Sequence, residues 1–221
     1  MELRLISVNV SLPRIIGRAA DGQEIWSGIA KRPLAQASVF VAATNIAGDG
    51  QADLTVHGGV DKAVYAYPSE HWPWWEQEKM LPSRAATFGE NLTVEGADES
   101  NVAIGDRFRW GDALLEVSQP RAPCFKFAIY TARADAPQLM TLSGRCGWYY
   151  RVIEQGNAPV MGATLMRVFA SSGPSVRDAF LAVFGRNVGT DSLRRVEAAP
   201  GLAESWRNPV LERLARRSES H

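Results

Sequence analysis

The residue in this sequence with the clearest chemical potential is Cys124, which ends the segment Ser118-Gln119-Pro120-Arg121-Ala122-Pro123-Cys124. Its two closest prolines fix the path of the chain and lack backbone donors, so the cysteine is expected to emerge from a stiff loop. Arg121 and Lys126 favour the thiolate, which is the form that attacks an electrophile or binds a metal. A thiolate is also a soft ligand that suits a polarisable metal centre. The alternative is a buried structural cysteine, which is the usual state of a lone thiol.

A second candidate is the glycine turn Val56-His57-Gly58-Gly59-Val60-Asp61-Lys62. Gly58 and Gly59 allow positive φ and a close approach of the backbone to a ligand. Consecutive N–H groups in such a turn bind anions, and Lys62 adds positive charge. His57 is the candidate proton carrier, because the ordinary histidine pKa of ~6.5 lies near neutrality. The segment lacks the Gly-Lys-Ser/Thr of a P-loop, and a plain hairpin turn with a solvated lysine is the alternative.

A third candidate is the segment Phe88-Gly89-Glu90-Asn91-Leu92. Glu90 and Asn91 place a carboxylate and an amide beside the flexible Gly89, just before a short strand-like run. The Asn91 amide has both a donor and an acceptor, which suits the edge of a heterocycle. An Asx-type turn with no ligand is the alternative.

Other reactive or aromatic residues are interpreted as structural. Cys146, at the start of a predicted strand, is expected to be a core thiol. His71 and the neighbouring tryptophans at 72, 74 and 75 are expected to form a helix face packed on a barrel, with substrate stacking as the alternative. A local basic pocket is also predicted if the fold brings together Arg121, Lys126, Arg145 and Arg151.

The composition limits the class of protein. The 221 residues suffice for one large domain or for a main domain with a small appendage. Basic and acidic side chains balance at 24 each, which argues against nucleic-acid partners because these require a basic field. The first ten residues do not resemble a secretory signal, and no run approaches the ~20 apolar residues that span a bilayer. We therefore expect a cytoplasmic protein without a disulfide or a membrane partner, and the two cysteines and three histidines match no zinc spacing.

These candidate residues require a β-rich scaffold over residues 1–170. Alternation of side chains predicts strands near residues 3–10, 39–41, 63–67, 92–94, 147–153 and 164–169, and a hairpin over 107–119 that turns at Gly111-Asp112. Residues 69–79 and 135–142 are predicted to be helical, the second with Asp135 as an acidic cap.

After Ser171 the pattern becomes helical. Ser175 and Asp178 form a capping box, and apolar residues from 176 to 184 follow helical spacing up to Gly185. Two further short helices are predicted near residues 193–196 and 202–214, with Pro209 delaying or kinking the last one. We therefore predict a small three-helix domain over residues 171–221, docked on the main domain.

Taken in order, the segments VHGGVDKAVYAYP, FGENL and NVAIGDRFRWGDALLEVSQPRAPC resemble the MOSC family, the molybdenum cofactor sulfurase C-terminal domain. The similarity is strongest to its YiiM-like branch, which is associated with resistance to 6-N-hydroxylaminopurine and carries a C-terminal three-helix domain. The resemblance therefore covers nearly the whole chain. It implies a mainly β fold, a MOSC-type β-barrel with short helices.

The resemblance also implies a site and an activity. Cys124 would be the protein ligand of a molybdenum–pterin cofactor. The residues around that cofactor would be His57, Gly58, Gly59, Lys62, Gly89, Glu90, Asn91, Ser118 and Arg121, with its phosphate on backbone N–H groups and on Arg121, Lys62 or Arg145. Related proteins reduce N-hydroxylated bases and amidoximes with electrons from a flavoprotein or a small redox carrier. The expected partners are thus a small N-hydroxylated substrate and an external flavin reductase.

Two other functions stay open at this point. In the first, the chain carries molybdenum cofactor or sulfur without reductase activity, and Cys124 serves as a persulfide carrier. In the second, the chain is a ligand-binding barrel that has lost its cofactor. A homodimer through exposed apolar surface is left open as well.

Overall fold

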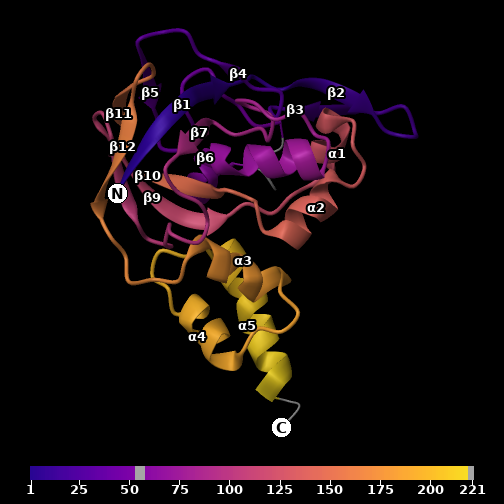
Figure 1. The fold of residues 1–221 in the computed structure, drawn as a ribbon, viewed down its shortest axis with the longest axis vertical. Coiled ribbons are helices and arrows are strands. Elements are labelled where there is room, and N and C mark those ends of the chain that lie inside the picture. The colour runs from indigo at the N-terminus through magenta and orange to yellow at the C-terminus, as the bar shows by residue number, and fades with distance from the viewer. Residues whose placement is uncertain (53–57, 219–221) are drawn as a thin grey trace.

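Seven strands close into a β-barrel in the computed structural model, which describes residues 1–52 and 58–218 (Figure 1). Their order is β12-β8-β9-β10-β6-β7-β1, and pairing of β1 with β12 closes the ring. Neighbouring strands are antiparallel except for β6 and β7, which run parallel. The barrel strands are β1 (Glu2–Val10), β6 (Val64–Pro68), β7 (Leu92–Glu95), β8 (Arg107–Trp110), β9 (Ala113–Pro120), β10 (Trp148–Glu154) and β12 (Thr164–Phe169). The predicted mainly β fold with a MOSC-type barrel is confirmed.

The side-chain alternation explains why these segments form the barrel. In β1, Leu3 and Leu5 are buried between exposed neighbours, so one face of the strand points into the core. Every residue of β9 is buried, because the C-terminal helices cover its outer face. The predicted β8–β9 hairpin forms, and Gly111 takes a φ of 57° at its turn. A Cβ atom there would lie 2.6 Å from the Asn157 carbonyl oxygen, so the turn requires glycine.

Five shorter strands lie outside the barrel ring in the described part of the chain. One strand, β5 (Ser38–Val41), was predicted, and it pairs with β11 (Gly156–Pro159). No pattern in the sequence predicted the hairpin of β2 (Arg14–Arg18) and β3 (Glu24–Ser27), or β4 (Arg32–Pro33), which pairs with β1. These segments are largely exposed and therefore lack the apolar alternation that marks a strand.

The helices within the barrel portion are short. The segment predicted to be helical over residues 69–79 is helical from Ser69 to Glu78. It begins as a 3-10 turn, η2 (Ser69–His71), continues in helical geometry through Trp72 and Pro73, and ends as a π-helix, η3 (Trp74–Glu78). The other helical segments are η1 (Val60–Lys62), α1 (Phe125–Thr131) and α2 (Ala136–Ser143).

Asp135 is the N-cap residue of α2, as predicted, but its side chain makes no capping hydrogen bond. The carboxylate instead accepts from the Arg133 guanidinium at 2.7 Å. The salt bridge therefore takes the place of the cap.

Three helices follow the barrel and gather at one end of it (Figure 1). The helix α3 (Val176–Phe184) begins with the predicted capping box of Ser175 and Asp178, and α4 (Thr190–Glu197) follows it. The last helix, α5 (Glu204–Ser218), begins five residues before Pro209, so the predicted delay at this proline is wrong. The Ala203 N–H donates to the Ser118 carbonyl at 3.0 Å and ties the start of α5 to β9. The division of the chain after residue 170 stays a prediction.

No helix in the described part of the chain combines the length and the apolar character that a bilayer crossing requires.

Candidate functional site

A cavity lies beside the half-buried Cys124 thiol, at the point where β9 leads through a loop into α1. It is formed by segments that are far apart in the sequence. Six of the residues predicted for the site line it, namely Gly58, Lys62, Gly89, Asn91, Arg121 and Cys124. The prediction that Cys124 would sit at a cleft, in contrast to a sealed position in the core, agrees with this geometry.

The two cysteines have opposite surroundings. Cys124 is accessible from the cavity, and its sulfur interacts electrostatically with the Arg121 guanidinium. Cys146 is fully buried, and its thiol donates to the Gly147 carbonyl at 3.2 Å. Burial raises the pKa of Cys146 well above its usual value, which suits an inert core thiol.

Arg121 is a buried cation at the wall of the cavity. Its guanidinium lies 4.9 Å from the centre of the Tyr65 ring and 5.4 Å from that of Phe127. Its hydrogen bonds go to the Tyr65 hydroxyl and to the Met140 sulfur, both at 3.5 Å. Burial lowers the pKa of Arg121, but its electrostatic interactions with Tyr65, Tyr149 and Cys124 outweigh this effect and raise it. No carboxylate pairs with Arg121 among residues 1–52 and 58–218, so this buried charge suits an anionic ligand.

A second buried cation, Lys31, lines the same cavity and was not among the sequence-based candidates. Its Nζ pairs with the Asp49 carboxylate, and both side chains are less than a tenth exposed. Asp49 also accepts from the Ser11 N–H and from the Asn91 amide, each at 2.9 Å. Burial lowers the pKa of Lys31, while the Asp49 carboxylate acts in the opposite direction. Nothing in the local sequence distinguishes Lys31 from a surface lysine.

The Asn91 amide was predicted to hydrogen-bond the edge of a heterocyclic ligand, but in the structure it bonds to other parts of the protein. Its Oδ1 accepts from the Tyr65 N–H at 3.1 Å. Its Nδ2 donates to Asp49 and to the Asn9 carbonyl at 3.2 Å. Because both ends of the amide are engaged within the protein, Asn91 orients Asp49 at the cavity wall.

Glu90 lies behind the cavity wall and does not line it. Its carboxylate accepts from the N–H groups of Ala86 and Phe88 and from the Thr93 hydroxyl, at 2.8, 3.0 and 2.7 Å. These bonds close the turn that presents Gly89, whose φ is 75°. A Cβ atom at Gly89 would lie 2.6 Å from the Ile29 side chain, so only glycine allows this close packing. Glu90 therefore shapes the site without being placed to contact a ligand.

The Glu90 carboxyl is expected to make the protein less stable as the pH rises. Burial raises the pKa of Glu90 from 4.5 to about 7, although its hydrogen bonds act in the opposite direction. Between these two values the folded protein keeps a proton that the unfolded chain loses. A stabilising contribution present below pH 4.5 is therefore lost as the pH rises through 7. The loss amounts to roughly 3 kcal/mol.

Urea unfolding at about pH 5 and about pH 8 measures this effect in the wild type and in Glu90→Gln, whose amide does not titrate. The stability difference between the two pH values should be larger in the wild type. An equal difference in the two proteins would show that Glu90 is not responsible.

The remaining predicted residues divide between the cavity and its support. Gly58 lines the cavity with a φ of 88°, whereas Gly59 has a φ of 85° but lies outside its wall. The Ser118 hydroxyl donates to the carbonyls of Asp61 and Tyr149, at 2.6 and 3.0 Å, and so holds η1 against the barrel. Ser118 thus positions the segment that carries Lys62. His57 lies outside the described residues.

The predicted basic pocket forms only in part. Arg121 and Lys126 line the cavity, but Arg145 and Arg151 do not. The Arg145 guanidinium lies 4.6 Å from the centre of the Trp74 ring. Arg151 pairs instead with Asp61 at 2.7 Å and with Glu116 at 2.8 Å. The structure therefore gives no support for a phosphate contact by Arg145.

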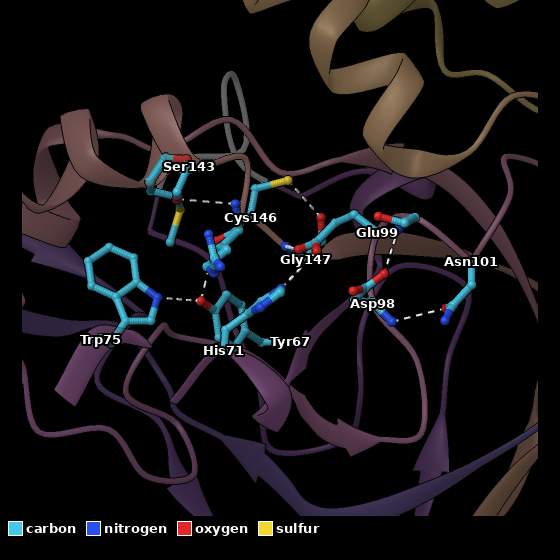
Figure 2. A network of polar contacts seen from close by, with 12 residues as sticks. Tyr67, His71, Trp75, Asp98, Glu99, Asn101, Ser143, Cys146 and Gly147 are labelled. Atoms are coloured by element: carbon cyan, nitrogen blue, oxygen red, sulfur yellow. Dashed lines mark hydrogen bonds and ion pairs between the residues drawn. The ribbon is translucent and has the colours of Figure 1, made fainter. Parts of the chain in front are cut away.

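A buried polar network holds Gly147, the residue just before β10 (Figure 2). The His71 ring points toward Glu99, with 2.7 Å between Nε2 and the carboxylate, and Glu99 accepts from the Gly147 N–H at 2.6 Å. The Gly147 carbonyl in turn accepts from the Arg121 N–H at 3.3 Å. His71 is buried within this network, as expected for a structural residue.

Comparison with known proteins accounts for the barrel and the order of the motifs. The model of the MOSC domain matches residues 53–166, which is more than half of the chain. The chain belongs to the MOSC family.

The similarity to YiiM-like proteins extends beyond the MOSC domain. The chain is 38% identical to YflK of Bacillus subtilis, over 96% of this chain and 95% of that protein. It is 40% identical to YiiM of Escherichia coli, over 75% of each chain. Its fold is similar to the crystal structure of YiiM from Geobacillus stearothermophilus, with a TM-score of 0.79, 32% identity, and coverage of 96% of this chain and 99% of the other. A protein of Gibberella moniliformis named a reductase is 38% identical over 64% of this chain, which spans 26% of that protein.

This MOSC cavity combines one soft ligand with a concentration of positive charge. Its thiol is Cys124, and its cations are Lys31, Lys62, Arg121 and Lys126. Asp49 is the only carboxylate among the described residues that line it, and this side chain is already paired with Lys31. Such a site suits a ligand that carries both a heavy metal and a phosphate.

Proposed function

We propose that this protein is a molybdenum-cofactor-dependent oxidoreductase that reduces N-hydroxylated compounds, such as 6-N-hydroxylaminopurine. The observation that carries the proposal is the position of Cys124, a half-buried thiol at a cavity with four cations. Membership of the MOSC family supports it, because MOSC domains are associated with this cofactor. The reductase name of the fungal relative is in line with a redox activity.

The residues at the cavity fit the cofactor by their chemistry. Cys124 would supply the thiolate ligand of the metal. Arg121, which has no carboxylate partner in the described part of the chain, would bind the phosphate together with Lys31 and Lys126. The glycine backbones at Gly58 and Gly89 would allow a flat pterin to come close to the wall. When bound, the cofactor supplies the electron pair that the reduction requires.

The net reaction breaks the N–O bond of the substrate and consumes two electrons and two protons, and its products are the amine and water. Lys62 lines the same cavity as Cys124, and its side chain would stabilise the departing oxygen. His57 stays a proposed proton carrier. The electrons come from a separate flavin reductase, which is the proposed partner. The protein's own contribution is to hold the metal, orient the substrate and supply protons.

Metal analysis together with turnover tests the proposal. Protein purified from cells that make the cofactor is expected to carry about one molybdenum per chain, as measured by mass spectrometry of the metal. The same preparation, supplied with a reduced viologen dye as electron donor, should convert 6-N-hydroxylaminopurine to adenine. Protein free of molybdenum would contradict the proposal. Loaded protein without turnover would favour a cofactor carrier.

A further inference from the structure

Cys124 lies between two cavities, and the second of these reaches the C-terminal helices. Each of the two cavities has an empty volume of about 630 Å³. They share Lys62, Cys124 and Tyr149. The second cavity is completed by the strand residue Gln119, the loop residues Ala122 and Pro123, and Ser205 and Trp206 of α5. We name it the α5 cavity.

We propose that the α5 cavity binds the substrate, that this substrate is an uncharged flat heteroaromatic compound, and that α5 contributes to its selection. The inference rests on the proposed function, since it assigns the substrate side of the same cysteine. It adds a binding role for α5, which lies outside the residues 53–166 that the MOSC model matches.

The distribution of charge separates the two cavities. The first cavity adds Lys31, Arg121 and Lys126 to the shared Lys62. In the α5 cavity, Lys62 is the only cation among the described lining residues. A phosphate is therefore attracted to the first cavity, and the α5 cavity is left for an uncharged ligand.

The walls of the α5 cavity suit a planar ring. Pro123, Tyr149 and Trp206 provide apolar and aromatic surface around the space next to the sulfur. Trp206 is held in place by the rings of Phe180 and Phe184, whose centres lie 6.1 and 5.9 Å from its own. Proteins that bind an isolated nucleobase commonly stack it between such side chains and read its edge by hydrogen bonds.

The polar edge is formed by a pair from two different parts of the fold. The Ser205 hydroxyl donates to Gln119 Oε1 at 3.0 Å, and Gln119 is only 2% exposed. Gln119 Nε2 makes one long contact, 3.4 Å from the Pro120 carbonyl. An amide nitrogen has two hydrogens, so one is left for an acceptor such as a ring nitrogen of the ligand. Because the Ser205 hydroxyl bonds to Gln119 Oε1, the side-chain amide is oriented with its Nε2 toward the ligand.

Binding of adenine to the cofactor-loaded protein tests the inference directly, because adenine is the product expected from 6-N-hydroxylaminopurine. The readout is the indole N–H signal of Trp206 in NMR spectra, assigned by its loss in Trp206→Phe. Adenine is expected to shift this signal.

In parallel, Ser205→Ala should raise KM by about five- to tenfold, with kcat and molybdenum content unchanged. Ser218→Ala, at the far end of the same helix, is the matched control and should leave KM unchanged.

The outcomes separate this inference from the proposed function. Two results would show that the α5 cavity is not the substrate site. One is a Trp206 signal that adenine leaves unchanged, and the other is an active Ser205→Ala protein with the same KM as Ser218→Ala. In either case the proposed function stands. If loaded protein shows no turnover but adenine still shifts the Trp206 signal, the α5 cavity binds a base and the proposed reductase function fails.

Discussion

Replacing Cys124 with serine is expected to lower the molybdenum content by about 100-fold and to abolish the reduction of N-hydroxylated substrate. The physical reason is that an alcohol is a far weaker ligand than a thiolate for a soft metal centre. The folding of the variant should be unaffected, because Cys124 lies half-exposed in a loop between β9 and α1. Metal analysis and thermal unfolding of the same samples check both parts of this expectation.

Cys146→Ser is the matched control, since it makes the same chemical change in the core. Cys146 is fully buried and donates only to the adjacent Gly147 carbonyl. A serine hydroxyl can make this bond, so the variant should keep its molybdenum and its activity at a cost of about 1 kcal/mol in stability. Full metal content in Cys124→Ser, or loss of metal in Cys146→Ser alone, would show that the ligand is assigned to the wrong residue.

Asp49→Asn is expected to cost about 3–5 kcal/mol of folding free energy, which is the usual effect of removing one partner of a buried ion pair. The Lys31 ammonium would lose its carboxylate in a place where its side chain is only 8% exposed. With its desolvation no longer opposed by Asp49, the pKa of Lys31 would fall further. The Ser11 N–H and the Asn91 amide would also lose an ionised acceptor. Guanidinium unfolding measures the loss.

Two comparisons identify the cause of that loss. Glu95→Gln removes the carboxylate of an exposed pair with Arg4, in which the side chains are 61% and 46% exposed, and should change stability by less than about 1 kcal/mol. The double variant Lys31→Met with Asp49→Leu removes both buried charges and should recover a large part of the stability, while binding the cofactor more weakly. A loss in Asp49→Asn no greater than that in Glu95→Gln would mean that the buried pair does not hold this wall of the cavity.

Several features of this protein could be predicted from neighbouring residues alone. The Gly111-Asp112 turn between β8 and β9 and the capping box of α3 are local patterns, and the structure confirms both. The strand β1 also forms as predicted, although its alternation of exposed and buried side chains holds only over residues 2–5. The order of the three motifs was sufficient to place the chain in its family. Such features depend on contacts within a few residues, where backbone geometry and side-chain polarity leave few choices.

The tertiary structure decided which of the candidate residues meet. Lys31 and Asp49 reach the cavity because closure of the barrel brings their loops beside Cys124, and no local pattern marks either residue. Asn91 was a candidate for binding a ligand, but contacts with the distant residues Tyr65, Asn9 and Asp49 engage both ends of its amide. Ser205 likewise reaches Gln119 only because α5 docks on β9. The sequence predicted most of the barrel strands, the C-terminal helices and the candidate thiol. The charge and shape around that thiol arise from contacts between distant segments, which only the closed barrel and its docked helices create.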